Sequence, residues 1–263
     1  MEIDQFSMLF FIGIVSVAAK YFGLLSLSGA AAAFFTGFFI MMGFGINGLV
    51  LMGVFFLTSS LWSRYKRTRK KFLGELHEKG STRDWAQVVA NGGTAGLLGL
   101  GHLLLPHPAW ILAFAISLAS ANADTWASEI GTLSKRNPLS VKSLQRVPRG
   151  TSGAISGLGS FASAAGSLLI ALVAYMLFRL EWELALVIFL FGFAGAVLDS
   201  FLGAHFQAIY NCRVCGLQTE RIIHCNKPTA KVSGYDWINN DIVNFFSCFI
   251  TSIVGTIVYM VFL

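Results

Sequence analysis

The sequence predicts an all-α, polytopic membrane protein with seven to eight transmembrane helices. Apolar residues make up 55% of the chain against 12% charged residues, with 24 Phe, 27 Gly and only 5 Pro. This apolar share far exceeds what the core of a soluble domain of this length needs. The apolar residues also gather in long segments separated by three polar stretches. We therefore expect residues 1–263 to form a single integral membrane domain.

A helix needs about 20 apolar residues to cross a bilayer, and most of the apolar segments reach or approach that length. In chain order the segments are 6–19, 24–42, 46–62, 85–105, 109–127, 155–178, 184–206 and 242–263. The first is short, so we expect it to be tilted, extended to Ile3 or only partly inserted.

The polar stretches, at about 63–84, 131–153 and 207–236, fall on one face of the membrane if the segments cross in alternation. That face carries 18 of the 19 Lys and Arg residues, with Arg179 on the other. The positive-inside rule makes this face cytoplasmic and, with eight spans, places the N-terminus outside. Topology and anionic headgroups account for the basic run Arg64–Lys71. We expect a bacterial cell (plasma) membrane, contact with membrane lipids and no nucleic-acid partner.

Acids and amides collect at the cytosolic ends of three apolar segments. A carboxylate facing lipid costs about 2.5–3.5 kcal/mol, so such residues indicate a partner. The residues are Asn122, Asp124 and Glu129 in the fifth segment, Asp199 in the seventh, and Asn240, Asp241 and Asn244 in the eighth. A helical wheel puts Asp124 and Asn122 on different faces, so we expect either a helix break near Asp124 or entry of only some residues into the site.

One interpretation treats these polar groups as contacts between helices. The other treats Asp124, Asp199 and Asp241 as ligands of a cation, because three acids without a basic residue in the membrane would repel one another. Carboxylate and amide oxygens suit Mg²⁺, which also binds phosphate oxygens. We favour the second interpretation.

A phosphate site is predicted where the second cytosolic stretch ends. Gly150 and Gly153 permit turns with exposed N–H groups, Thr151 or Ser152 can cap the following helix, and Arg149 lies beside them. Lys142 and Arg146 precede this turn, farther into the cytosol, where a triphosphate tail would enter.

These motifs together resemble the integral membrane family of transmembrane protein 19 and the plant phytyl-phosphate kinases. The resemblance spans nearly the whole chain and rests on four motifs: 122–131, 147–153, Gly195 to Asp199, and 237–244. It implies a kinase that converts an isoprenoid lipid monophosphate into the diphosphate with a nucleoside triphosphate, CTP being favoured. The chain has no Walker-type P-loop, so the site would lie at the membrane interface.

We expect Asp124, Asp199, Asp241 and Arg149 to act in catalysis. We expect the remaining residues to bind substrate or nucleotide: Asn122, Glu129, Lys142, Arg146, Gly150, Thr151, Ser152, Gly153, Asn240 and Asn244. The alternatives are a lipid-phosphate transporter or scramblase, and a CTP-dependent prenol kinase or cytidylyltransferase. Few polar residues lie in the outer half of the membrane, which disfavours a carrier.

A second constellation lies in the third cytosolic stretch. Cys212 and Cys215 form a C-x-x-C pair, and His224 and Cys225 follow about ten residues later. These residues can close a tetrahedral Zn²⁺ site that would hold the loop, or they can be free or redox-active thiols. Adjacent His and Cys residues make awkward joint ligands. We expect no catalytic role for them.

Overall fold

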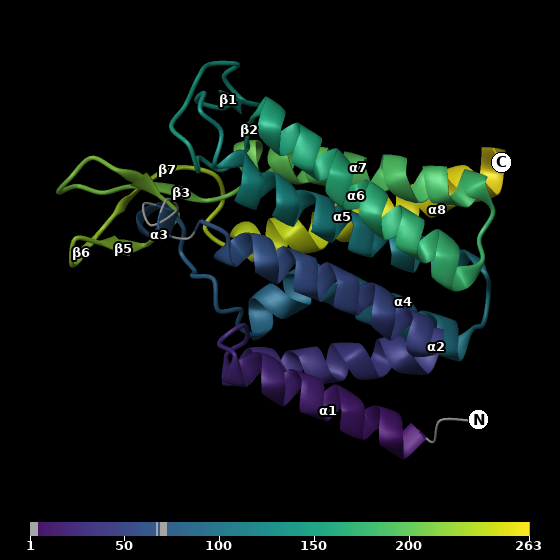
Figure 1. The fold of residues 1–263 in the computed structure, drawn as a ribbon. Coiled ribbons are helices and arrows are strands. Elements are labelled where there is room, and N and C mark those ends of the chain that lie inside the picture. The colour runs from purple at the N-terminus through teal and green to yellow at the C-terminus, as the bar shows by residue number, and fades with distance from the viewer. Residues whose placement is uncertain (1–4, 67, 69–72, 263) are drawn as a thin grey trace.

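The computed structural model describes residues 5–66, 68 and 73–262. The predicted extension to Ile3 and part of the basic run, Arg67 and Arg69–Lys71, lie outside the described residues. The long helices are α1 (Gln5–Tyr21), α2 (Leu27–Arg64), α4 (Trp85–Leu104), α5 (Ala109–Gly131), α6 (Gly157–Phe178), α7 (Trp182–His205) and α8 (Asn240–Phe262). They lie side by side in one bundle (Figure 1). Their bounds fall close to the predicted apolar segments.

Helix α2 is two helices joined at Gly45, whose φ of 63° and ψ of −156° are not helical. Only glycine adopts this conformation without steric cost. The second arm returns alongside the first, and near its end the Arg64 guanidinium donates a hydrogen bond to the carbonyl of Phe22, which lies shortly before the first arm. The two arms match the predicted segments 24–42 and 46–62, so the bundle contains eight long helical segments.

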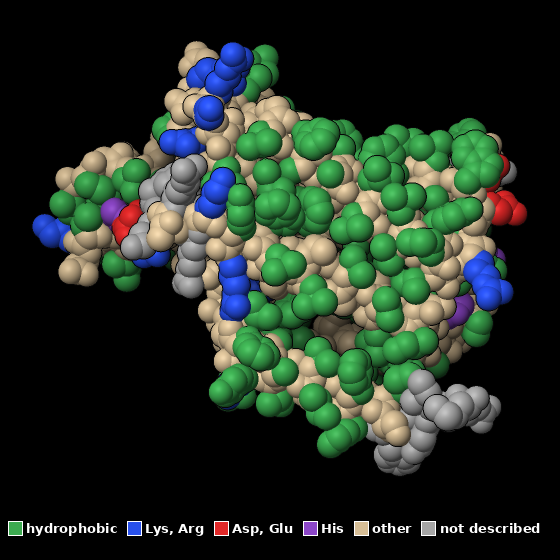
Figure 2. Space-filling model, viewed as in Figure 1, with side chains coloured by type: hydrophobic (Ala, Val, Ile, Leu, Met, Phe, Trp, Pro, Cys, Tyr) green, Lys and Arg blue, Asp and Glu red, His purple; other side chains and the backbone are tan. Residues whose placement is uncertain are grey.

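Helix α5 lies at the centre of the bundle. Every residue from Leu112 to Ala123 is buried, and α5 contacts α2, α4, α6, α7 and α8. Outer helices instead expose large apolar side chains, among them Phe10 and Phe161, and apolar side chains cover much of the face in Figure 2. An apolar surface of this extent is typical of lipid contact. By length and composition, α2, α6, α7 and α8 are candidate membrane spans.

Short strands lie at one end of the bundle, in polar stretches where the all-α prediction had placed loops. The first sheet pairs β1 (Leu139–Ser140) with β2 (Ala154–Ile155). The second has the order β4 (Gln218–Thr219), β3 (Ile209–Asn211), β7 (Ala230–Ser233). A third pairs β5 (Ile223–His224) with β6 (Lys227–Pro228). The one-turn helix α3 (Leu73–Leu76) lies against β4.

The two ends of the bundle differ in charge. Blue side chains of Lys and Arg gather at the strand-bearing end in Figure 2. Among the described basic residues, Arg179 lies at the other end, where it caps α6. The charge partition predicted from the sequence is therefore present among the described residues.

Candidate active site

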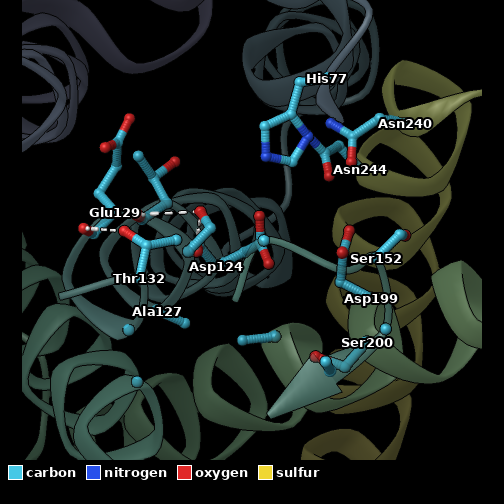
Figure 3. A pocket seen from close by; sticks show the side chains of 18 of the residues that line it. His77, Asp124, Ala127, Glu129, Thr132, Ser152, Asp199, Ser200, Asn240 and Asn244 are labelled. Carbon is cyan, nitrogen blue, oxygen red and sulfur yellow. Dashed lines mark hydrogen bonds between the residues drawn. The ribbon is translucent and has the colours of Figure 1, made fainter. Parts of the chain in front are cut away.

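A cavity of about 980 Å³ opens at the strand-bearing end of the bundle. Its wall comes from the ends of α4, α5, α6, α7 and α8, and from the polar stretches that follow α2 and α5. The predicted residues that line it are Asp124, Glu129, Arg149, Gly150, Thr151, Ser152, Gly153, Asp199, Asn240, Asp241 and Asn244. Figure 3 shows several of them pointing into this space.

Asp124 of α5 and Asp199 of α7 lie on neighbouring walls of the cavity, and their carboxyl groups are close enough to interact directly. Asp199 is only 8% exposed, and its Oδ2 accepts a hydrogen bond of 3.1 Å from Ser247 Oγ on α8. Helix α5 runs unbroken to Gly131. The expected break near Asp124 is therefore absent, and the structure shows the other expected outcome, entry of only some residues, because Asp124 and Glu129 line the cavity and Asn122 does not.

Helix α8 contributes amides to the same cavity. Asn240 and Asn244 are one turn apart and both line it. Asn244 Oδ1 is buried and has no hydrogen-bond partner among the described residues. A buried acceptor without a donor is costly, so this oxygen is suited to a ligand.

Asp241 has a different environment from the one predicted for a third metal ligand. Lys79, in the stretch before α4, pairs with Asp241 and also with Asp84, whose Oδ2 lies 2.9 Å from Lys79 Nζ. Burial alone would lower the pKa of the Lys79 ammonium, but its hydrogen bonds to Asp241 and Asp84 raise it above its ordinary value. Asp241 therefore forms a clamp with Lys79 at the cavity wall, and its predicted role as a metal ligand stays a prediction.

A chain of polar contacts connects His77, in the stretch before α4, with Glu220 after β4 and with Ser152 after β1. His77 Nδ1 lies 3.3 Å from Glu220 Oε1, and Gln207 Nε2 donates to the same oxygen at 2.8 Å. Ser152 Oγ in turn donates to Gln207 Oε1 at 2.8 Å. Burial alone would lower the pKa of the His77 imidazole, but the hydrogen bond and charge of Glu220 raise it. Burial would raise the pKa of the Glu220 carboxyl, but His77 lowers it.

The Arg149–Gly153 turn lies on the cavity wall, as expected from its glycines. Gly150 and Gly153 have φ of 86° and 68°. A Cβ on Gly153 would meet Ala204 Cα at 2.4 Å, so glycine is required there. The predicted helix cap is wrong: strand β2 follows the turn, and Ser156 caps α6 by accepting a hydrogen bond from the Gly159 N–H. Arg149 Nη1 donates to the carbonyl of Ser134 at 3.2 Å, which holds its guanidinium beside the turn.

The sequence matches the family described as integral membrane protein DUF92 over residues 10–252. The chain belongs to this family. Protein PGR of Arabidopsis thaliana is 31% identical over 89% of this chain and 88% of its own length. An uncharacterised membrane protein of Methanocaldococcus jannaschii is 32% identical over 68% and 73%.

Protein VTE6, chloroplastic, of Arabidopsis thaliana is 26% identical to this DUF92 protein over 88% of this chain and 64% of its own length. No solved structure matches the chain. The resemblance stated from the motifs is thereby confirmed.

Three of the residues predicted to bind substrate or nucleotide lie outside the cavity wall. Asn122 is fully buried; its Oδ1 accepts from Thr58 Oγ1 at 3.1 Å and its Nδ2 donates to the Gly166 carbonyl at 2.8 Å. The structure therefore makes Asn122 a contact between helices, and we withdraw its predicted role in binding. Lys142 and Arg146 are exposed in the loop before the turn, where Arg146 Nη1 donates to the Asn137 carbonyl.

Cavity-lining residues that the sequence analysis did not single out come mainly from the stretch before α4. They are His77, Lys79 and Arg83. The Arg83 guanidinium lies over the rings of Phe55 and Phe56, at 5.9 and 5.6 Å from their centroids. Burial lowers the pKa of Arg83 to about 10, so it keeps its charge near neutral pH. In the sequence, the one sign that could have drawn attention to Arg83 was its position directly before Asp84, the residue that caps α4.

Proposed function

We propose that this protein is a membrane-embedded phosphotransferase that converts an isoprenoid lipid monophosphate to the diphosphate, with CTP as the favoured donor. The observation that carries the proposal is the composition of one cavity wall. Carboxylates from α5 and α7 line the same cavity as an amide oxygen of α8 that has no partner among the described residues, and Arg83 and Arg149 also line this cavity. Oxygen ligands for a metal and guanidinium groups for phosphates are what two polyanionic substrates require.

The residues fit Mg²⁺, because Asp124, Asp199 and Asn244 Oδ1 offer only hard oxygen ligands. These three residues would hold the ion, which would neutralise charge on the phosphates of the donor. A phosphate oxygen of the lipid attacks the terminal phosphorus of the nucleotide, the bond to the bridging oxygen breaks, and the nucleoside diphosphate leaves. A monophosphate is largely ionised at neutral pH, so the attack needs little general-base help.

Arg149 and Arg83 would then orient the reacting phosphates through their paired donors. The lipid chain needs an apolar exit to the side. Phe193 and Val197 of α7 line the cavity, and Val197 is 54% exposed on the bundle surface. These positions favour a lateral opening along α7. The isoprenoid chain would pass through this opening and stay in the bilayer.

We further infer that all eight long helical segments cross the bilayer of a cell membrane and that the cavity opens to the cytoplasm. The positive-inside rule supports this orientation, because the described basic residues lie at the cavity end with the exception of Arg179. The helices that have polar residues at this end, such as α5, reach the interface there.

The test is phosphoryl transfer by purified protein in nanodiscs. Terminally labelled CTP, ATP, GTP or UTP is offered with prenyl monophosphates of several chain lengths, and with the matching prenols. We expect label to appear in a lipid diphosphate, with CTP the best donor and prenols inactive. Transfer to prenols or release of a CDP-lipid would indicate the alternative transferase. Translocation of lipid phosphate across liposomes without consumption of any nucleotide would indicate a carrier.

A further inference from the structure

Four potential metal ligands meet in the strand-bearing end, apart from the cavity. One ligand atom each from Cys212, Cys215, His224 and Cys225 lies within 4.8 Å of all the others. Cys212 and Cys215 lie between β3 and β4, and His224 and Cys225 lie at the end of β5 where it turns toward β6. We propose that these four residues bind a structural Zn²⁺ that fixes the β3–β7 region, and with it the stretch carrying His77 and Lys79, over the mouth of the cavity.

The distances fit a tetrahedral Cys₃His site. Zn–S bonds of about 2.3 Å and Zn–N bonds of about 2.0 Å imply a sulfur-to-nitrogen separation of roughly 3.5 Å around one ion. His224 Nδ1 lies 3.5 Å from Cys215 Sγ and 3.3 Å from Cys225 Sγ. The peptide N–H of Val214 donates to Cys212 Sγ at 3.4 Å, a contact that favours the thiolate form needed for metal binding.

The backbone also explains how two adjacent residues can both serve as ligands. Cys225 and Asn226 have φ of 52° and 57°, the left-handed conformation of a tight two-residue hairpin turn. Asn is common at such positions, whereas Cys is not, so a side-chain role accounts for Cys225 better than turn preference does. Binding through Nδ1, the ring nitrogen nearer the backbone, brings the imidazole of His224 close enough to share an ion with its neighbour.

The second nitrogen of His224 has the partner that metal-bound histidines usually have. Its Nε2 lies 3.0 Å from Glu75 Oε2 of α3. A carboxylate there keeps the proton on Nε2 and leaves the lone pair of Nδ1 for the metal. This contact also joins the cluster to α3, which lies immediately before His77.

Further hydrogen bonds carry the position of the cluster to the cavity mouth. Thr219 Oγ1 donates to the carbonyls of Glu75 and Leu76, both at 2.8 Å. Arg221 Nε donates to the His77 carbonyl at 3.0 Å. Since β4 and the residues after it thus hold the His77 backbone, an ion that fixes these hairpins would also fix the Glu220–His77 pair.

The test is the metal content of protein purified under reducing conditions without chelator. By mass spectrometry of all first-row metals, we expect about one zinc per chain in the wild type and in Cys248→Ser, whose thiol is buried in α8. In Cys212→Ser/Cys225→Ser the zinc should be lost. Cobalt substitution should give the sulfur-to-metal charge-transfer absorption of a thiolate site. Iron in place of zinc, or a wild type with almost no metal and reactive thiols at all three positions, would overturn the proposal.

A second variant keeps every ligand and so avoids the question of folding. Glu75→Gln removes only the charge behind His224, and we expect its zinc affinity to fall about tenfold in competition with a chelator. Glu78→Gln, three residues later and not in contact with His224, is the matched control and should bind zinc as the wild type does. Equal affinities of both variants and the wild type would contradict the role of Glu75 and the Nδ1 geometry. None of these readouts depends on phosphotransferase activity.

Discussion

Lys79 pairs with Asp241 although 162 positions separate them in the sequence. This pair attaches the stretch before α4 to the first turn of α8, at the edge of the cavity. Lys79 also contacts Asp84, the N-cap of α4. Three elements therefore meet at one ammonium group.

Asp241→Asn should lower the rate of transfer by about tenfold, the usual effect of removing a supporting contact. Lys79 would keep Asp84 as a partner, so its ammonium group should stay at the start of α4 although the link to α8 is lost. The check is kcat with saturating substrates, compared with Asp236→Asn, an exposed acid that pairs with Lys231 on the loop. A loss as large as that of Asp124→Asn would instead support Asp241 as a metal ligand.

Asp124→Asn and Asp199→Asn should each reduce kcat by more than about 100-fold, because each would remove direct support of charge in the transition state. Both should still insert and elute as folded protein. Rates measured over a Mg²⁺ titration, with size-exclusion profiles, provide the check. Near wild-type rates in both variants would mean that these acids only join helices.

Arg149→Lys should lower mainly kcat, because a planar two-pronged donor becomes a point charge. Lys142→Ala should raise mainly the KM for the nucleotide and leave the KM for the lipid phosphate unchanged, since Lys142 is exposed outside the cavity wall. Steady-state kinetics with each substrate varied in turn distinguishes the two. An unchanged Arg149→Lys protein would remove the turn from the site.

The His77–Glu220 pair should make attachment of the 206–239 region to the stretch before α4 depend on pH. The raised pKa of His77 contributes stability that is complete below its unfolded pKa and is lost as pH rises through the folded value. The lowered pKa of Glu220 contributes stability that is lost as pH falls through its folded value. Attachment should therefore be strongest between these two values. Proteolysis of the 206–239 region across pH measures it, and His77→Gln should abolish the alkaline loss.

Gly153→Ala should lower the thermal midpoint and impair transfer, because an alanine there has an unfavourable φ, costing about 1–3 kcal/mol, and contacts Ala204. Gly157→Ala is the matched control. Its Cβ would meet nothing within 4 Å and it lies in α6, so it should be neutral or stabilising. Equal effects of the two would contradict the requirement for glycine in the turn.

Accessibility labelling should find positions 142 and 227, and the basic run at 64–71, on the cytoplasmic side and position 179 outside. Single cysteines at these positions in whole cells, labelled with an impermeant maleimide, measure this. Labelling of position 142 from outside would reverse the orientation and the site built on it.

Much of this arrangement was available from the sequence, and the exceptions have physical reasons. Apolar runs predicted the long helices, and their polar ends predicted the depth of Asp124 and Asp199. The wheel indicated that Asn122 and Asp124 face different ways, but it could not say which one entered a cavity. His77, Lys79 and Arg83 come from a stretch without periodicity, where no pattern gives direction. The cysteine motif stayed ambiguous because a hairpin turn, which spacing does not reveal, decides whether adjacent ligands converge.

The turn of α2 at Gly45 has a consequence for how the chain enters the bilayer. No charged residue lies between Leu27 and Ser63, so nothing in this region would anchor the tip of the hairpin at a headgroup surface. Its depth is set instead by neighbours, such as the Asn47 Nδ2 that donates to the Leu177 carbonyl of α6 at 2.8 Å. The two arms should thus partition into lipid together, as one unit, and reach their final depth only after α6 has been synthesised.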